Sequence, residues 1–371
     1  MKKLLGAAVL SGTVACAHAQ STVTLYGLMD EGLDFTNNAN GSKAYVMDSG
    51  FIQGSRWGLK GEESLGAGLK ALFQLENGFN VNNGKLGQSG RMFGRQAYVG
   101  IFSAAYGSIK LGRQYDSIVD YVSTLSGGIL SHPYDNDNFG FTFRLQNTIK
   151  YTSPSFSGVQ FGGTYSFSND TNFANNRAFS AGANYSVGGL LVGIGYLQGN
   201  SPSSDTTGAI GDSFFGATRL RIFGGGAKYR FGSAAVGILY TDSYLQNPTS
   251  SVYVGAITPT GGGASSLRFQ NFEINGKYDF TPFFNVGAMY NYTKATLSES
   301  GGKLKPNYQT VGVMADYFLS KRTDVYVVGA YQHVGGDTTG SVLDFAYVPF
   351  SAGVSSNRNQ LFARVAIRHK F

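Results

Sequence analysis

The residue types that carry out catalysis or bind metals are sparse and poorly spaced in this sequence. Of the four histidines, His18 lies near the beginning of the chain, and His132, His333 and His369 lie far apart, so no pair has a metal-binding spacing. Gly193-Ile194-Gly195 lacks the third glycine of a dinucleotide-binding turn at the required spacing. Gly211-Asp212-Ser213 lacks the second glycine of a nucleophile elbow. We therefore expect no cofactor, no metal site and no catalytic group.

Positively charged side chains, in contrast, follow a regular pattern. From Asn359 to Phe371, polar residues alternate with apolar ones. Successive side chains of a β-strand point to opposite faces, so this segment predicts a strand with one cationic and one apolar face. The polar face holds Gln360, Arg364, Arg368 and Lys370, and the apolar face holds Leu361, Ala363, Val365, Ile367 and Phe371.

Three other segments separate their charges in a similar way. Residues that share a polar face are Arg56 with Lys60, Arg144 with Lys150, and Lys110 with Ser108. Charges that line a water-filled space between walls of low dielectric constant attract ions of the opposite sign. The chemistry that these residues predict is therefore the attraction of anions.

Alternating segments of about ten residues recur along the chain, as transmembrane β-strands require. Helical periodicity is not evident beyond residue 19. We predict strands near residues 22–36, 51–63, 69–81, 91–103, 106–113, 142–153, 159–168, 178–187, 190–198, 218–231, 234–244, 269–280, 283–296, 308–319, 323–334 and 359–371.

Short and long connections alternate between these segments. The short ones are turn sequences such as Gly188-Gly189 and Thr281-Pro282. The long ones are rich in Asn, Ser, Gly and Thr and lie near 37–50, 82–90, 114–141, 169–177, 199–217, 245–268, 297–307 and 335–358. In lipid every backbone N–H and C=O needs a partner, so spanning strands must close into a barrel. The fold class predicted is all-β, a transmembrane 16-stranded antiparallel β-barrel, which is wide enough to enclose water.

The beginning of the chain predicts export. A basic start at residues 1–3, a short apolar stretch and Ala17-His18-Ala19 are typical of a signal peptide, residues 1–19, with the barrel in residues 20–371. Cys16, the single cysteine, lies in the predicted leader. A lipoprotein signal would have a leucine shortly before this cysteine, and Thr13-Val14-Ala15 lacks one. The chain is rich in glycine, with 53, and only 14% of its residues are charged. The formal net charge is +7, but an exported protein with singly spread charges is not expected to bind nucleic acid.

The sequence resembles the general porins of Gram-negative outer membranes, especially those of beta-proteobacteria. The similarity covers the chain beyond the leader, and the order and spacing of its motifs carry it. These motifs are VTLYG at 23–27, GSRWGLKGE at 54–62, FQLENGF at 73–79, GRQAYVG at 94–100, LGRQYD at 111–116, NTIKY at 147–151 and the closing phenylalanine. The resemblance implies a homotrimer in the outer membrane, in contact with lipid and lipopolysaccharide.

The resemblance also implies that the third long loop folds into the barrel and narrows it, and that arginines line the opposite wall. By motif match the wall residues are Arg56, Arg95 and Arg144; Arg95 rests on the resemblance alone, because both faces of its strand carry apolar residues. Lys60 and Lys110 are further candidates for the basic wall. Among the loop acids, Asp116 and Asp120 are expected to face the arginines, because they lie where the loop leaves its strand. The Pro-Glu-Phe-Gly motif of enterobacterial loops is absent.

Two residues carry expectations about assembly. Glu31 shares the lipid-facing parity of Val23, Leu25 and Leu33, which is costly for a carboxylate, so we expect it at a subunit interface, near His369 or an arginine, unless a bulge turns it inward. Phe371 matches the position of the C-terminal assembly signal of outer-membrane barrels.

The function that this sequence predicts is a water-filled diffusion channel for small hydrophilic solutes and inorganic ions, weakly selective for anions. The alternatives are a substrate-specific channel for organic anions, a barrel enzyme such as a lipase, and an adhesin without conductance. An enzyme would need a serine beside a histidine at the outer rim, and only His333 approaches that position. We therefore expect a channel and not an enzyme.

Overall fold

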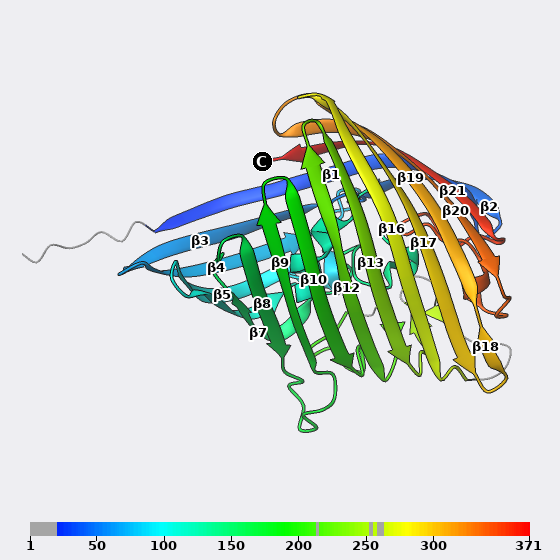
Figure 1. Cartoon of the computed structure of the whole chain (residues 1–371), viewed down its shortest axis with the longest axis horizontal. Coiled ribbons are helices and arrows are strands. Elements are labelled where there is room, and N and C mark those ends of the chain that lie inside the picture. The colour runs from blue at the N-terminus through cyan, green and yellow to red at the C-terminus, as the bar shows by residue number, and fades with distance from the viewer. Residues whose placement is uncertain (1–20, 213–214, 252–254, 258–262) are drawn as a thin grey trace, which may run out of the picture.

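The computed structural model describes residues 21–212, 215–251, 255–257 and 263–371. The predicted leader and Gln20 lie outside the described residues. Sixteen long strands, each paired antiparallel with the next, form the wall (Figure 1). They are β1 (Thr22–Ala39), β3 (Arg56–Gly66), β4 (Leu69–Gly78), β5 (Gln96–Ser103), β6 (Gly107–Gln114), β7 (Leu145–Thr152), β8 (Val159–Ser166), β9 (Ala178–Val187), β10 (Leu190–Asn200), β12 (Arg219–Phe231), β13 (Ala234–Gln246), β16 (Ser266–Thr281), β17 (Phe284–Glu299), β19 (Pro306–Phe318), β20 (Thr323–Gly336) and β21 (Asn359–Lys370).

The sheet closes on itself between its first and last strands. β1 pairs with β3 through residues 22–28 and with β21 through residues 28–36. Phe371, which follows β21, continues this pairing: its N–H donates to the Gly27 carbonyl at 3.1 Å, and the Gly27 N–H donates to its carbonyl at 3.0 Å. The closed ring gives the backbone N–H and C=O groups of both strands hydrogen-bond partners, as the predicted barrel requires.

The wall is apolar outside and polar inside. In β16, Phe272 and Ile274 are exposed on the outer face, whereas Glu273, Asn271 and Asn275 are buried on the inner face. The alternation predicted for β21 is also present, because Leu361, Val365 and Ile367 are exposed while Gln360, Arg364 and Arg368 are buried. Among the described residues, no helix is long and apolar enough to cross a membrane.

The second predicted strand differs from the observed one. Residues 37–50 are not a loop: β1 extends to Ala39, and β2 (Ser42–Ser49) returns beside it in the same wall. The chain then leaves the wall at residues 50–55 and re-enters it as β3. Phe51 lies in this excursion, where its ring stacks on Phe362 at 4.9 Å between centroids. The connection near 297–307 is likewise a hairpin extension that contains β18 (Gly302–Leu304).

The remaining elements are short and belong to the connections. They are α1 (Gly87–Gly90), α2 (Ser117–Tyr121), η1 (Ser123–Leu125), η2 (Pro133–Asp135), η3 (Val342–Asp344) and a small separate sheet of β11 (Phe215–Gly216), β14 (Ser250–Ser251) and β15 (Gly255–Ala256).

The connection between β6 and β7, residues 115–144, folds into the barrel. Its helix α2 packs against the inner face of β9 and β10, behind the green strands in Figure 1. Glycines make this close approach possible: a Cβ at Gly193 would lie 2.1 Å from the Tyr121 carbonyl oxygen, and one at Gly182 would lie 2.6 Å from the Tyr121 ring. Gly193, which resembles part of a nucleotide-binding turn in the sequence, therefore accommodates the loop.

Candidate functional site

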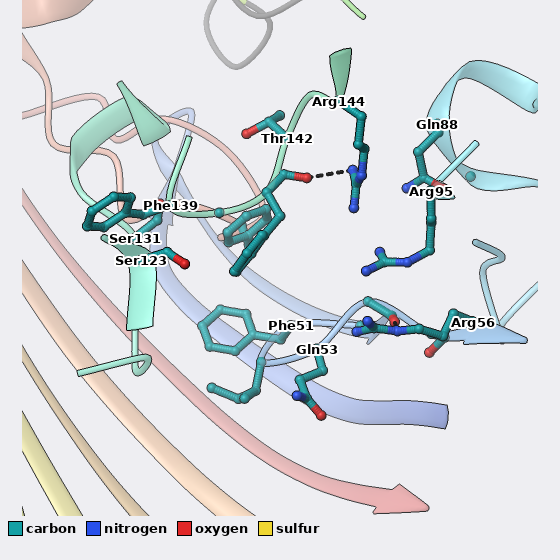
Figure 2. A pocket seen from close by; sticks show the side chains of 18 of the residues that line it. Phe51, Gln53, Arg56, Gln88, Arg95, Ser123, Ser131, Phe139, Thr142 and Arg144 are labelled. Atoms are coloured by element: carbon teal, nitrogen blue, oxygen red, sulfur yellow. Dashed lines mark hydrogen bonds between the residues drawn. The ribbon is translucent and has the colours of Figure 1, made fainter. Parts of the chain in front are cut away.

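Three arginines line one side of a cavity inside the barrel. The cavity has a volume of about 830 Å³ and lies between the infolded loop, the 50–55 excursion and the wall at β3–β7. Arg56 begins β3, Arg95 precedes β5 and Arg144 precedes β7. Figure 2 shows the three guanidinium groups converging on the same space.

Arg95 and Arg144 share a hydrogen bond to one tyrosine hydroxyl. The Tyr115 hydroxyl accepts from Arg95 Nη2 at 3.0 Å and from Arg144 Nη2 at 2.9 Å. Arg95 Nε also donates to Glu76 at 2.8 Å, and Arg144 Nη1 donates to the Phe141 carbonyl at 2.6 Å. These hydrogen bonds fix both guanidinium groups, and both residues are almost fully buried.

Arg56 is held more loosely. Its Nε donates to the Gly54 carbonyl at 2.8 Å, which ties it to the 50–55 excursion. The local excess of positive charge is evident at Tyr115. Burial alone would raise the pKa of this phenol, but the charges of Arg144, Arg95 and Arg56 outweigh burial and lower the pKa.

The two predicted lysines lie outside the residues that line this cavity. Lys60 Nζ sits over the Tyr26 ring at 5.4 Å, and Lys110 Nζ sits over the Tyr98 ring at 4.9 Å. Lys110 is also in register with Lys150 of the neighbouring strand. The lysines thus continue the basic wall from the arginines toward the end with the short turns.

The structure corrects the expectation for the loop acids. Asp116 does not face the arginines: it is fully buried and caps α2, where its Oδ1 accepts from the Ile118 N–H at 2.8 Å and from the Val119 N–H at 3.2 Å. Asp120 forms an ion pair with Lys150 and not with an arginine of the cavity. Neither residue lines the cavity.

The carboxylate that does reach the cavity comes from a different loop. Asp212, in the connection between β10 and β12, lines the cavity and forms ion pairs with Arg91, at 2.5 Å, and with Arg113. The Gln146 N–H donates to the Ala209 carbonyl at 2.8 Å and helps to hold this loop inward. The sequence gives no signal for the ion pairs of Asp212, because they join residues about a hundred positions apart.

Across from the arginines, the cavity is lined by aromatic and aliphatic side chains. They come from the 50–55 excursion, from the infolded loop and from the connection between β20 and β21, and include Phe51, Ile129, Phe139 and Phe350, while Phe141 lies beside Arg144. Phe51 and Phe139 are labelled in Figure 2, apart from the guanidinium groups. One side of the cavity is therefore cationic. The opposite side, here called the apolar side, carries these rings together with the hydroxyls of residues such as Ser123 and Ser131, and no carboxylate among its described residues.

A buried histidine fastens the infolded loop to the far wall. His132 Nε2 lies 2.8 Å from Glu273 of β16, and its Nδ1 contacts Asp137 of the loop. The Gly127 N–H also donates to Glu273, at 2.7 Å. Among the residues described by the structure, no group of three or more His, Cys, Asp and Glu side chains could hold a metal ion.

The two residues expected to act in assembly lie on the outer face. Glu31 has the outward parity of β1, but its carboxylate oxygens are buried within the chain and have no hydrogen-bond partner in its described part. Its neighbours across the sheet are Ser49 and Ile367, while His369 bonds to Thr323 at 2.9 Å. The Phe371 ring lies over Gly27, where a Cβ would collide with it at 2.2 Å.

Comparison with known proteins gives consistent matches. The model of a family described as Gram-negative porin matches residues 6–337. An outer membrane porin protein of Bordetella pertussis is 34% identical over 373 residues, covering 89% of this chain and 94% of the relative. Outer membrane porin protein 32 of Delftia acidovorans is 28% identical and covers 100% of this chain and 99% of its own length.

Solved structures share the fold. An anion-selective porin from Comamonas acidovorans superposes with a TM-score of 0.70 at 23% identity, over 95% of this chain and 100% of that chain. The trimer form of OmpT from Vibrio cholerae superposes with a TM-score of 0.65 at 16% identity, over 95% of this chain and 99% of that chain.

Proposed function

This chain belongs to the family of Gram-negative porins and is an outer-membrane diffusion channel, and we propose that its arginine-lined cavity is the constriction that makes the channel prefer anions. The observation that carries this proposal is the charge balance of the lining. Arg56, Arg95 and Arg144 all line the cavity, while the one carboxylate among its described lining residues, Asp212, is paired with two other arginines.

The physical reason is electrostatic focusing. A narrow aqueous passage with walls of low dielectric constant concentrates the field of its charges, so unbalanced guanidinium groups raise the local concentration of anions. Lys60 and Lys110 extend the positive potential along the wall. The likeness of the fold to a porin described as anion-selective supports the same reading.

The test is the reversal potential of the purified protein in a planar bilayer that separates two concentrations of potassium chloride. Arg56→Gln is the sharpest variant, because only its Nε is hydrogen-bonded within the described chain, whereas Arg95 and Arg144 also hold Tyr115. We expect the ratio of chloride to potassium permeability to fall toward one.

Arg358→Gln serves as the matched control. Arg358 is a loop residue that does not line the cavity, and its Nη2 donates to the Thr338 hydroxyl at 2.8 Å. It should leave the permeability ratio unchanged. An unaltered ratio in Arg56→Gln, or a wild-type channel that prefers cations, would contradict the proposal.

We further propose that the channel is a homotrimer whose contact includes the outer face of β1 and β21 around Glu31, with lipid and lipopolysaccharide around the remaining surface. The outward parity of Glu31 on an apolar face supports this arrangement, as does the trimeric form of one structural relative. Phe371 is proposed as the assembly signal because it completes the pairing of the first and last strands.

A barrel enzyme accounts for these observations less well. The His333 imidazole, the candidate for a rim histidine, bonds to Asn359 at 2.8 Å rather than to a serine. The relatives described above are porins, which are channels. A channel for organic anions, in contrast, is favoured by the apolar side of the cavity.

A further inference from the structure

We propose that the constriction is a binding site for small aromatic carboxylates, which pass by transient binding and not by diffusion alone. This inference rests on the proposed anion preference of the cavity and adds a substrate class to it. The observation behind it is the juxtaposition of three guanidinium groups with a set of phenylalanines across one cavity.

The cationic side offers free donors for a carboxylate. Within the described chain only the Nε of Arg56 is hydrogen-bonded, so its two terminal nitrogens face the cavity without a protein acceptor. A planar carboxylate matches the fork of a guanidinium and can accept two hydrogen bonds from it.

The phenylalanines of the cavity offer a surface for a ring. Phe141 has 38% of its surface exposed although it stands beside Arg144, and its ring meets the Tyr115 ring edge to face at 5.6 Å between centroids. Water and inorganic ions offer an exposed phenyl group no favourable packing contact. It does gain from a flat apolar solute, because aromatic rings pack favourably edge to face or offset.

The backbone supports the assignment. Phe141 and Phe350 both line the cavity, and both have left-handed backbones, with φ of 55° and 67°. This conformation is unfavourable for bulky residues and persists where the surrounding structure enforces it, often at ligand sites. Two phenylalanines on separate loops that border the cavity therefore have strained backbones.

Size and charge select the ligand class. A volume of about 830 Å³ is within the range of small-molecule sites. Neutral aromatic compounds would leave the arginines without an anion, and acetate would leave the phenylalanines in contact with water. Benzoate satisfies both sides at once and is the simplest probe.

The experiment is single-channel recording of the full protein in potassium chloride, with benzoate, acetate or benzyl alcohol added to one side. We expect benzoate to cause transient, saturable interruptions of the chloride current, and acetate and benzyl alcohol to cause none at equal concentration. Phe141→Ala should weaken the apparent affinity for benzoate about tenfold, the loss expected for one aromatic contact.

The matched control is Phe173→Ala, which removes an exposed phenylalanine that does not line the cavity. It should leave the benzoate interruptions unchanged. Phe141→Ala retains the Cβ at the left-handed position, so it adds no backbone strain. Arg56→Gln should lose both anion preference and benzoate binding.

Two failures are distinguishable. An anion-preferring wild-type channel that treats benzoate and acetate alike overturns this inference and leaves the proposed function intact. A channel without anion preference overturns both. Equal interruptions in wild type and Phe141→Ala would place any benzoate site elsewhere and would also refute the assignment.

Discussion

At the scale of single residues, strand parity predicts which side chains face inward, but it does not assign all of them. Parity places Arg56 and Lys60 on one face of β3. Parity also places Arg144 with Lys150, although Arg144 lies one residue before β7, whereas Arg95 lies one residue before β5 and is not assigned by parity. The sequence assigns Asp116 to the pore by its place in the loop, but its carboxylate caps the N-terminus of α2, as an aspartate before a helical turn commonly does. A reading of helix capping would have removed Asp116 from the candidate pore acids.

Asp212 carries a prediction at the same scale. Replacing it with asparagine removes the carboxylate that pairs with Arg91 and Arg113, so the positive charge at the cavity increases. We expect the ratio of chloride to potassium permeability to rise by about threefold, the factor that a change of about one kT in the local potential produces. The reversal potential in a salt gradient measures this ratio.

The control for this change is Asp205→Asn in the same loop. Its carboxylate accepts from the Thr207 N–H at 2.9 Å and does not line the cavity. It should leave the reversal potential at the wild-type value. A fall in anion preference in Asp212→Asn would show that the acid organises the arginines and does not offset their charge.

At the scale of elements, alternation predicts the strands well and the connections poorly. Each predicted strand overlaps an observed strand, because one face must meet lipid and the other must meet water along its whole length. The second strand is misplaced because Phe51 and Ile52 look like a continuation of the apolar pattern. They instead turn inward, and Phe51 packs on Phe362. Contacts of the infolded loop, such as Gly127 with Glu273, join residues too distant in sequence for any local pattern to predict.

The histidine that fastens this loop predicts a dependence on pH. Burial alone would lower the pKa of His132, but the charge of Asp137 and the bonds to Asp137 and Glu273 outweigh burial and raise the pKa to about 10. Since this value exceeds the ordinary 6.5, the stabilisation is complete below pH 6.5 and is lost as the pH rises through about 10. We expect the current through single channels to become noisier above pH 10, as the loop loosens.

His132→Gln separates this effect from general alkaline damage. It leaves two buried carboxylates without their cation, a loss of about 3–5 kcal/mol in the docking of the loop. Its channels should be noisy at pH 7 already and should change little up to pH 10.5. His333→Gln, on the outer rim, should behave as wild type; a wild-type channel with constant noise from pH 7 to 10.5 would contradict the role of His132.

At the scale of the whole molecule, composition and alternation together determine the architecture. A chain with few charges, many glycines and no helical periodicity can satisfy its backbone in lipid only as a closed barrel. The closure appears where β1 meets β21 and where Phe371 bonds to Gly27. Which part of the outer face meets lipid and which meets another subunit does not follow from alternation, because both environments favour apolar side chains. A polar exception such as Glu31 is therefore the informative residue.

Glu31 carries the prediction at this scale. Its oxygens lack a partner within the described chain, and the outer face around it is apolar, with Leu33 63% and Val365 60% exposed. If a neighbouring subunit supplies a donor, Glu31→Leu leaves that donor buried and unpaired, at a cost of about 1–3 kcal/mol per contact. We expect the trimer to dissociate at a lower temperature in SDS.

If Glu31 meets lipid instead, the same change removes a costly carboxylate, and the barrel should resist heat better than wild type. Gln270→Leu adds an apolar side chain to the outer face of β16, away from β1, and should leave the dissociation temperature unchanged, so a drop confined to Glu31→Leu would locate the subunit contact at β1.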